Sequence, residues 1–218
     1  MVQFSDLTGL LIAVVAIGLI PFVAMVATSY AKIVVVLGLL RNALGVQQVP
    51  PNMVLNGIAI LVTAYVMAPI GMQAVQNMQS MPHRGGSDSS AIVLDAFDAG
   101  KEPFRAFLKA HAHEREKRFF VHSASAIWPK DMAAKLREDD LIVLAPAFTL
   151  TEMTDAFKIG FLLYIAFVVV DVVIANVLMA MGLNQVQPTN VAIPFKLLLF
   201  VAMNGWSTLI HGLVMTYR

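Results

Sequence analysis

Long apolar stretches separated by short polar breaks dominate the pattern along this chain. Four of them carry few or no charges and have roughly the length of a membrane span: residues 7–27, 53–72, 157–182 and 191–214. A helix needs about 20 residues to cross about 30 Å of hydrocarbon. A fifth apolar piece, residues 33–40 between Lys32 and Arg41, is too short to span. The pattern therefore predicts an all-α protein built from hairpins of apolar helices.

Prolines and glycines divide and bend these stretches. Pro21 lies inside the first and Pro69 near the end of the second, where each is expected to kink its helix. Gly45 and the Pro50–Pro51 pair end the short apolar piece, and Asn52 is a suitable cap for the helix that follows. Kinked helical hairpins are therefore expected, rather than straight independent spans.

A charged insert interrupts the apolar pattern over residues 73–156 and holds most of the acidic and basic residues. A water-facing, mainly helical region is predicted there, with a Gly/Ser linker at 81–90 and a short helix between Pro129 and about residue 140. The predicted helix at 103–120 places four residues on one stripe: Phe104, Phe107, Leu108 and His111. Three regions result, residues 1–72, 73–156 and 157–218.

The last two apolar stretches are predicted to form a helical hairpin. Gly182 ends the first of them and a polar segment, residues 184–190, follows it. Thr189 or Asn190 is expected to cap the final helix, with Pro194 tolerated in or near its first turn.

Composition agrees with a membrane protein or an obligate assembly. Hydrophobic residues make up 58% of the chain and charged residues 13%, with a mean hydropathy of +0.74. The net charge of +1 gives no basic field for nucleic acid, and the absence of cysteine excludes disulfides and thiolate chemistry. The first nine residues carry no Lys or Arg, so no cleavable signal peptide is expected.

Three polar residues lie within or next to apolar helices: Asp171, Asn176 and Lys196. A charge in hydrocarbon is costly unless it is paired or reaches water. Two interpretations stay open, a pore-lining or inter-subunit polar contact and a direct Asp171–Lys196 pair joining two helices of one subunit.

Two methionines, Met179 and Met181, directly precede Gly182. Methionine is flexible enough to close a hole around varied surfaces, and ordinary core packing is the alternative.

No residue pattern indicates catalysis or a bound cofactor. His111, His113, Glu114 and His122 lack the spacing of a metal site, because His111 and His113 point to different sides of a helix. A solvated charged face explains them better. No phosphate-binding glycine loop, nucleophile elbow or H-E-x-x-H motif is present, so a non-enzymatic protein without cofactor or metal is predicted.

Three blocks resemble the FliP/YscR/SctR family of type III secretion proteins over nearly the whole chain. The first is Thr28–Tyr30 through residues 39–45 to Pro50–Asn52. The second runs from Pro146 through Glu152 to residues 156–161, with Asp171 at the family's aspartate. The third joins residues 194–197 to the Gly205–Trp206 pair.

The resemblance implies an export-gate subunit of the bacterial inner membrane. In the family, several copies, a pentamer, join S-, T- and U-type subunits in a helical funnel for unfolded secreted proteins. Much of that funnel stands outside the hydrocarbon, on the periplasmic side, so the insert is expected in the periplasm and membrane lipid nearby. The resemblance also makes Lys32, Arg41, Lys158, Asp171, Asn176 and Lys196 candidates for contacts between helices or subunits.

Two positions depart from the family. Relatives carry a methionine-rich loop at the narrowest point, whereas this chain continues after Gly182 with Leu183, Asn184 and Gln185. The predicted constriction therefore comprises Met179, Met181, Leu183, Asn184 and Gln185. Asn204 replaces the family's usual acidic residue. The short amino terminus and the connection at residues 45–49 resemble injectisome members more than flagellar ones.

Two functions from other classes are the alternatives. The polar residues within apolar helices suit a small-solute or proton transporter, but no internal two-fold repeat is apparent. The charged insert suits a membrane anchor or scaffold for a soluble partner.

Overall fold

The computed structural model describes residues 11, 14–15, 18–19, 21–80 and 89–218, and this part of the chain contains helices and no strands. The predicted all-α class is confirmed. The predicted linker at 81–90 lies largely outside the described residues, and the apolar run at 7–27 lies partly outside them. Residues 21–26 of that run are helical.

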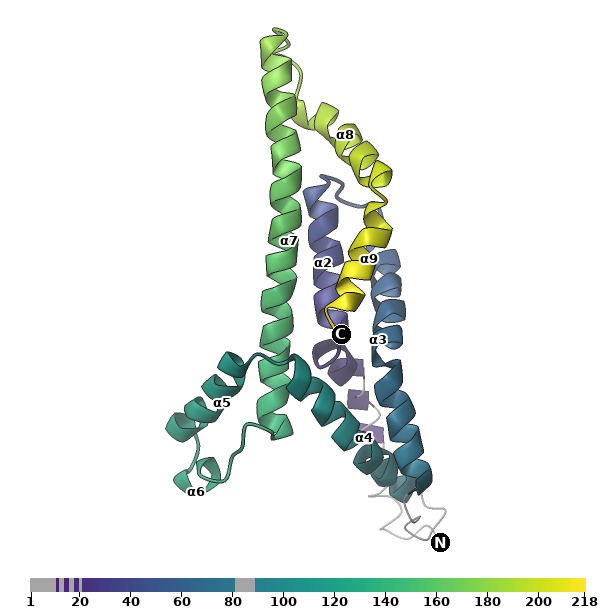
Figure 1. Ribbon diagram of the computed structural model, residues 1–218, viewed down its shortest axis with the longest axis vertical. Helices are drawn as coiled ribbons and strands as arrows, with labels where there is room; N and C mark the ends of the chain where they lie inside the picture. Colours follow the sequence, from purple (N-terminus) through teal and green to yellow (C-terminus); the bar gives the residue numbers. More distant parts are fainter. Residues whose placement is uncertain (1–10, 12–13, 16–17, 20, 81–88) are drawn as a thin grey trace. The chain divides into compact units, whose positions relative to one another are not determined.

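Eight helices have assigned bounds in the described part of the chain (Figure 1). They are α2 (Tyr30–Ala43), α3 (Asn52–Ser80), α4 (Ser89–His111), α5 (Glu114–Ile127), α6 (Lys130–Ala133), α7 (Leu141–Ala180), α8 (Pro188–Ala202) and α9 (Gly205–Met215).

Two helices, α3 and α7, are long and apolar enough to cross a membrane. The pair α8 and α9 passes the same test together but bends by 63° at its break. The continuous helix predicted over 191–214 is therefore wrong, because the chain turns sharply at Asn204. Pro194 also lies well inside α8, since that helix begins at Pro188 with Gln187 as its N-cap.

The described chain forms two compact units. Unit 1 comprises Met1–Ala31 with Ala64–Glu152, and unit 2 comprises Lys32–Thr63 with Met153–Arg218. Both α3 and α7 contribute to both units, so the predicted boundaries after residues 72 and 156 fall within continuous helices. The division of the chain into three regions stays a prediction.

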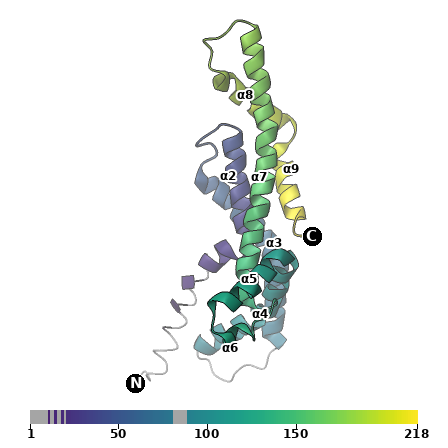
Figure 2. The same cartoon turned by 90° about the vertical axis from the view of Figure 1, so that its left-hand side faces the viewer.

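Unit 1 packs the charged insert around a small aromatic core. The Phe107 and Phe148 rings lie 5.4 Å apart, and Leu108 is fully buried. Phe107 and Leu108 of the predicted stripe thus face the interior. The single helix predicted over 103–120 is wrong, because α4 ends at His111 and α5 begins at Glu114. A hydrogen bond of 2.9 Å from the His113 backbone N–H to the Thr151 hydroxyl fixes the break between α4 and α5. Figure 2 shows α5 and α6 next to each other.

Unit 2 has α2 at its centre. Ile33, Val36, Leu37 and Leu40 on α2 are fully buried. At the crossing of α2 with α7, a Cβ added to Gly160 would lie 2.2 Å from Leu39 Cδ1 and 2.9 Å from Leu39 Cβ. Glycine is therefore required at residue 160, because it lets the two helices approach closely. Leu40 and Leu44 join Phe167 and Phe200 in one core cluster.

Candidate functional site

The hairpin of α7 and α8 carries the five residues predicted to form a constriction, and its turn is set by backbone hydrogen bonds. Gly182 has φ +75°, in the left-handed region that favours glycine. Its N–H donates to Met179 O at 3.0 Å, and the Leu183 N–H donates to Leu178 O at 2.9 Å. These two bonds form a Schellman motif, which closes the end of α7 without any side-chain partner. The side chains at the tip therefore take no part in ending the helix.

All the predicted constriction residues are exposed at this tip. Met179 and Met181 have exposed fractions of 59% and 64%, and Leu183 has 40%. Asn184 and Gln185 are exposed as well. Val186, which the sequence reasoning did not single out, is also exposed, and its position after two amides places an apolar side chain on the α8 side of the turn. The tip therefore offers apolar and amide groups together and no charge.

Below the tip, Lys196 of α8 joins three helices. Its ammonium donates to Asp171 Oδ2 of α7 at 2.6 Å and to Ala43 O at the end of α2 at 3.1 Å. The Lys196 side chain is only 6% exposed, whereas that of Asp171 is 41% exposed. A cation near the carbonyl end of a helix also interacts favourably with the helix dipole. The structure thus places the Asp171–Lys196 pair within one chain, and Ala43 is a partner that the sequence did not indicate.

Between the two arms of the hairpin lies an apolar cavity of about 430 Å³. Valines and isoleucine of α7 line one side, and Val191, Phe195 and Leu199 of α8 line the other. Several of these side chains, Val173 and Phe195 among them, are exposed, so the cavity opens on the surface of the hairpin.

The bend between α8 and α9 depends on two adjacent residues. Asn204 has φ +50°, a left-handed conformation that Asn and Asp tolerate better than other non-glycine residues. A Cβ on Gly205 would lie 2.2 Å from the Phe200 ring. The Phe200 and Trp206 rings meet edge to face at 5.5 Å. The departure at residue 204 is therefore compatible with a backbone role, which asparagine fulfils without a charge.

The other four predicted contact residues are placed separately. Lys32 is buried, with its ammonium 4.0 Å from the centre of the Tyr217 ring. Arg41 donates to Asn52 Oδ1 at 2.5 Å and so ties the end of α2 to the start of α3. Lys158 pairs with the neighbouring Asp155 at 2.9 Å and is 62% exposed. Asn176 is exposed on α7. The sequence analysis did not single out Tyr217, because nothing in the sequence around a tyrosine shows which distant cation its ring contacts.

The charged insert contains ion pairs, and no metal site is found in the described part of the chain. A hydrogen bond from Lys117 lowers the pKa of Glu114, and a hydrogen bond from Lys109 lowers the pKa of Asp139. Within the described ranges, no three His, Cys, Asp or Glu side chains come together as metal ligands would. Instead, His111 Nδ1 lies 2.9 Å from Phe107 O. The charged and histidine side chains of the insert therefore form ion pairs and hydrogen bonds that support its local structure.

Comparisons with known proteins give the family. Residues 12–213 match the FliP family. "Pathogenicity-related ORF2" of Xanthomonas campestris pv. glycines is 67% identical over 99% of this chain and 100% of its own length. "Hypersensitivity response secretion protein HrcR" of Ralstonia nicotianae is 63% identical, again over 99% and 100%. "Yop proteins translocation protein R" of Yersinia pestis is 46% identical over 100% of this chain and 99% of its own.

These relatives are injectisome proteins rather than flagellar ones, as the amino terminus and the connection at residues 45–49 predicted. The chain belongs to the FliP family and is an injectisome-type subunit of a type III secretion export apparatus.

Proposed function

We propose that several copies of this chain, together with the S-, T- and U-type subunits, form the channel that carries unfolded proteins across the bacterial inner membrane. The observation that carries this proposal is the exposed tip of the α7–α8 hairpin, held on a backbone-capped turn above the half-buried Asp171–Lys196 ion pair. In our proposal, the tips of the copies converge and constrict the channel.

The large apolar surface of the chain supports an assembly. Only 11% of the most apolar 18-residue window is buried in α3, and likewise in α7. Such a surface must be covered by lipid or by other subunits, because exposed apolar patches on soluble proteins are much smaller. A homo-oligomer, a pentamer as in the family, provides that cover.

The composition of the tip suits a seal that must open for varied substrates. Methionine and leucine side chains close a gap against water and ions, because a hydrophobic constriction gates by excluding water. Asn184 and Gln185 would add a ring of amides that can bond a passing peptide backbone. Repeated around an oligomer, two methionines and Leu183 would replace the methionine-rich loop of relatives.

We assign the chain no catalytic role, and other components supply the energy for export. The proposed location is the inner membrane. In this proposal the helices lie largely at its periplasmic side, and residues 73–156 lie in the periplasm. The buried Lys32 and the Arg41–Asn52 contact would hold α2 as the fixed element of each subunit, while Lys158 and Asn176 are exposed and available to neighbours.

Removing the tip side chains tests the proposed constriction. We expect the double variant Leu183→Ala/Gln185→Ala to raise ion leakage through the reconstituted complex and to change secretion of substrates. The matched control is Val172→Ala, which truncates an exposed side chain in the middle of α7. If leakage and secretion both stay at the level of the unmodified chain, the tip is not the constriction.

A further inference from the structure

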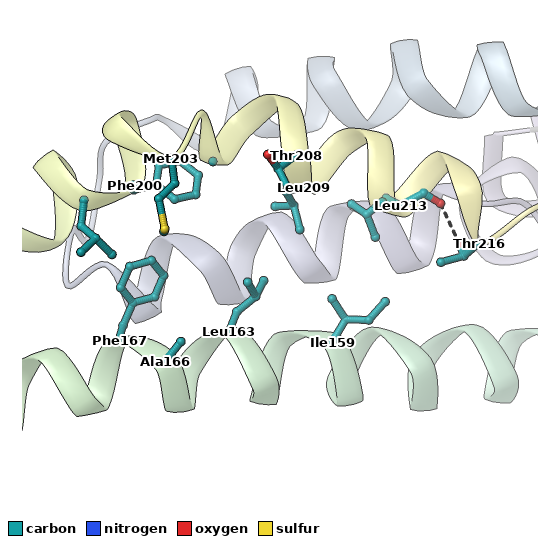
Figure 3. A pocket seen from close by; sticks show the side chains of 13 residues that line it. Ile159, Leu163, Ala166, Phe167, Phe200, Met203, Thr208, Leu209, Leu213 and Thr216 are labelled. Carbon is teal, nitrogen blue, oxygen red and sulfur yellow. Dashed lines mark hydrogen bonds between the residues drawn. The ribbon is translucent and has the colours of Figure 1, made fainter.

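A second apolar cavity, of about 490 Å³, lies within unit 2 between α7 and the bent pair α8 and α9. Figure 3 shows the side chains that line this groove, spread along α7 and α9. Ile159, Leu163 and Phe167 of α7 line one wall, and Phe200, Leu209 and Leu213 are on the other. This groove is distinct from the hairpin tip and takes no part in the proposed constriction.

The groove offers no free polar group to an occupant. The Thr216 hydroxyl donates to Leu213 O at 2.7 Å, and Figure 3 shows the Thr208 hydroxyl turned away from α7. An extended peptide placed here would lose its hydrogen bonds to water and gain none, which is costly for each backbone group. The occupant must therefore be a hydrocarbon rather than a segment of exported protein.

Size argues for a single chain of hydrocarbon. The α9 wall from Gly205 to Thr216 is about 16 Å long, and a helix about 10 Å across would fill about 1,300 Å³ over that length. The cavity has less than half of that volume. At about 30 Å³ per water-sized group it holds about sixteen such groups, roughly one membrane acyl chain. A neighbouring helix would enter only with its side chains.

The two ends of the groove differ in polarity. At one end Phe167, Phe200 and Met203 close it with apolar side chains. The other end is at Ile159 and Thr216, which lie close in sequence to the exposed residues Lys158 and Arg218. Lys158 also pairs with Asp155 at 2.9 Å, and its side chain is 62% exposed. Exposed basic side chains at the end of an apolar surface commonly lie at the boundary between hydrocarbon and lipid headgroups. The polarity thus orients an amphipathic molecule, with its charged end at Lys158 and Arg218.

We propose that this groove binds one acyl chain of an anionic phospholipid, with the phosphate at the Lys158 and Arg218 end. The bound lipid belongs to the protomer itself and fills its cavity. Where the assembled funnel stands outside the bilayer, such a retained chain would keep the cavity free of water. This inference rests on membrane association alone and not on the proposed constriction.

Filling the groove tests the proposal. Gly212 lines the cavity and a Cβ there meets nothing within 4 Å, so Gly212→Leu places a larger side chain at the groove without backbone crowding at its Cβ. The matched control is Gly71→Leu, because Gly71 also lies in a candidate span with nothing within 4 Å and does not line the cavity. Both changes favour helix formation by about the same amount.

The readout is native mass spectrometry of the detergent-purified chain with added dioleoylphosphatidylglycerol. We expect one lipid per protomer on the unmodified chain and on the Gly71→Leu variant. In the Gly212→Leu variant the ratio of lipid-bound to free protomer should fall at least tenfold. A ratio that is unchanged in Gly212→Leu, or reduced equally in both variants, would overturn the assignment. Equal binding of oleate, or of the same lipid by a Lys158→Gln/Arg218→Gln variant, would overturn the orientation of the headgroup.

A single cysteine identifies the occupant directly, because the chain contains no other. A fluorophore on His211→Cys, next to Gly212 on α9 but outside the lining, should be quenched by phospholipid that carries a nitroxide deep in its acyl chain, and more strongly than the same label on Gly71→Cys. If the label on His211→Cys shows no extra quenching and unlabelled Gly212→Cys forms disulfide-linked dimers, a second copy of the chain occupies the groove and the lipid proposal is wrong.

Discussion

Replacing Lys196 by methionine removes the ammonium that joins α2, α7 and α8. The Lys196 side chain is 6% exposed and bonds both Asp171 and Ala43 O. Breaking a buried ion pair from one side costs about 3–5 kcal/mol. Because Asp171 is 41% exposed, water solvates the carboxylate left behind in Lys196→Met, and a loss of about 2 kcal/mol is expected. Asp171→Leu should cost more, about 3 kcal/mol, since it leaves a buried ammonium.

The double variant Lys196→Met/Asp171→Leu leaves neither charge. Only Ala43 O then lacks its side-chain partner, which costs about 1–3 kcal/mol. The two substitutions are therefore expected to be strongly non-additive, with the double variant no less stable than Asp171→Leu alone. Thermal unfolding followed by tryptophan fluorescence in a Trp128→Phe background, where Trp206 is the remaining tryptophan and contacts Phe200 in unit 2, reports these changes. For a chain of this size each kcal/mol shifts Tm by about 2–4 °C.

Additive losses would refute the direct pair, because two residues that do not interact contribute independently. In that case the two charges would have separate partners, as the inter-subunit interpretation requires. The control is Lys158→Met, which breaks an exposed pair with Asp155 and should change stability by less than about 0.5 kcal/mol.

Three further predictions concern single positions. Gly160→Ala should cost about 1–3 kcal/mol through overpacking against Leu39, and Leu39→Ala in the same chain should recover part of the loss in thermal unfolding. Asn204→Val should cost about 1–2 kcal/mol at its positive φ, whereas Asn204→Gly should be nearly neutral; equal losses would refute a backbone role. In NMR titration Lys117→Met should raise the pKa of Glu114 towards its ordinary 4.5. Because the native pKa is lowered, the pair stabilises the fold above the ordinary value, and the contribution disappears as pH falls through the lowered one.

The apolar pattern predicted the helices well and their ends poorly. Composition identified residues 73–156 as an insert, but α7 begins at Leu141 and passes through Glu152, which is almost fully buried. A change in charge reports the surroundings of a helix and not where the helix begins. The bend at Asn204 escaped prediction for a related reason. The segments before and after Asn204 are both apolar, and a left-handed φ at one residue does not change the pattern of apolar positions in the sequence.

The candidate site was predictable in part. Gly182 indicated the turn, and the left-handed φ there has the physical cause expected of a glycine after a helix. The two interpretations of Asp171 and Lys196 stayed open because 25 residues and a turn of unknown register separate them. Only the spacing of the two helices decides whether the charges meet. Ala43 O was unpredictable from sequence, since any backbone carbonyl could have filled that position.

The Lys196 contact gives the hairpin the mechanics of a lever. From Asp171 to its end at Ala180, α7 extends about 14 Å beyond this fulcrum as a continuous helix. A tilt of about 10° at the fulcrum would carry the end of α7 sideways by about 2 Å, from the same rise per residue. Small rearrangements around α2, amounting to the loss or gain of one hydrogen bond, would then be amplified into a larger displacement of the exposed tip.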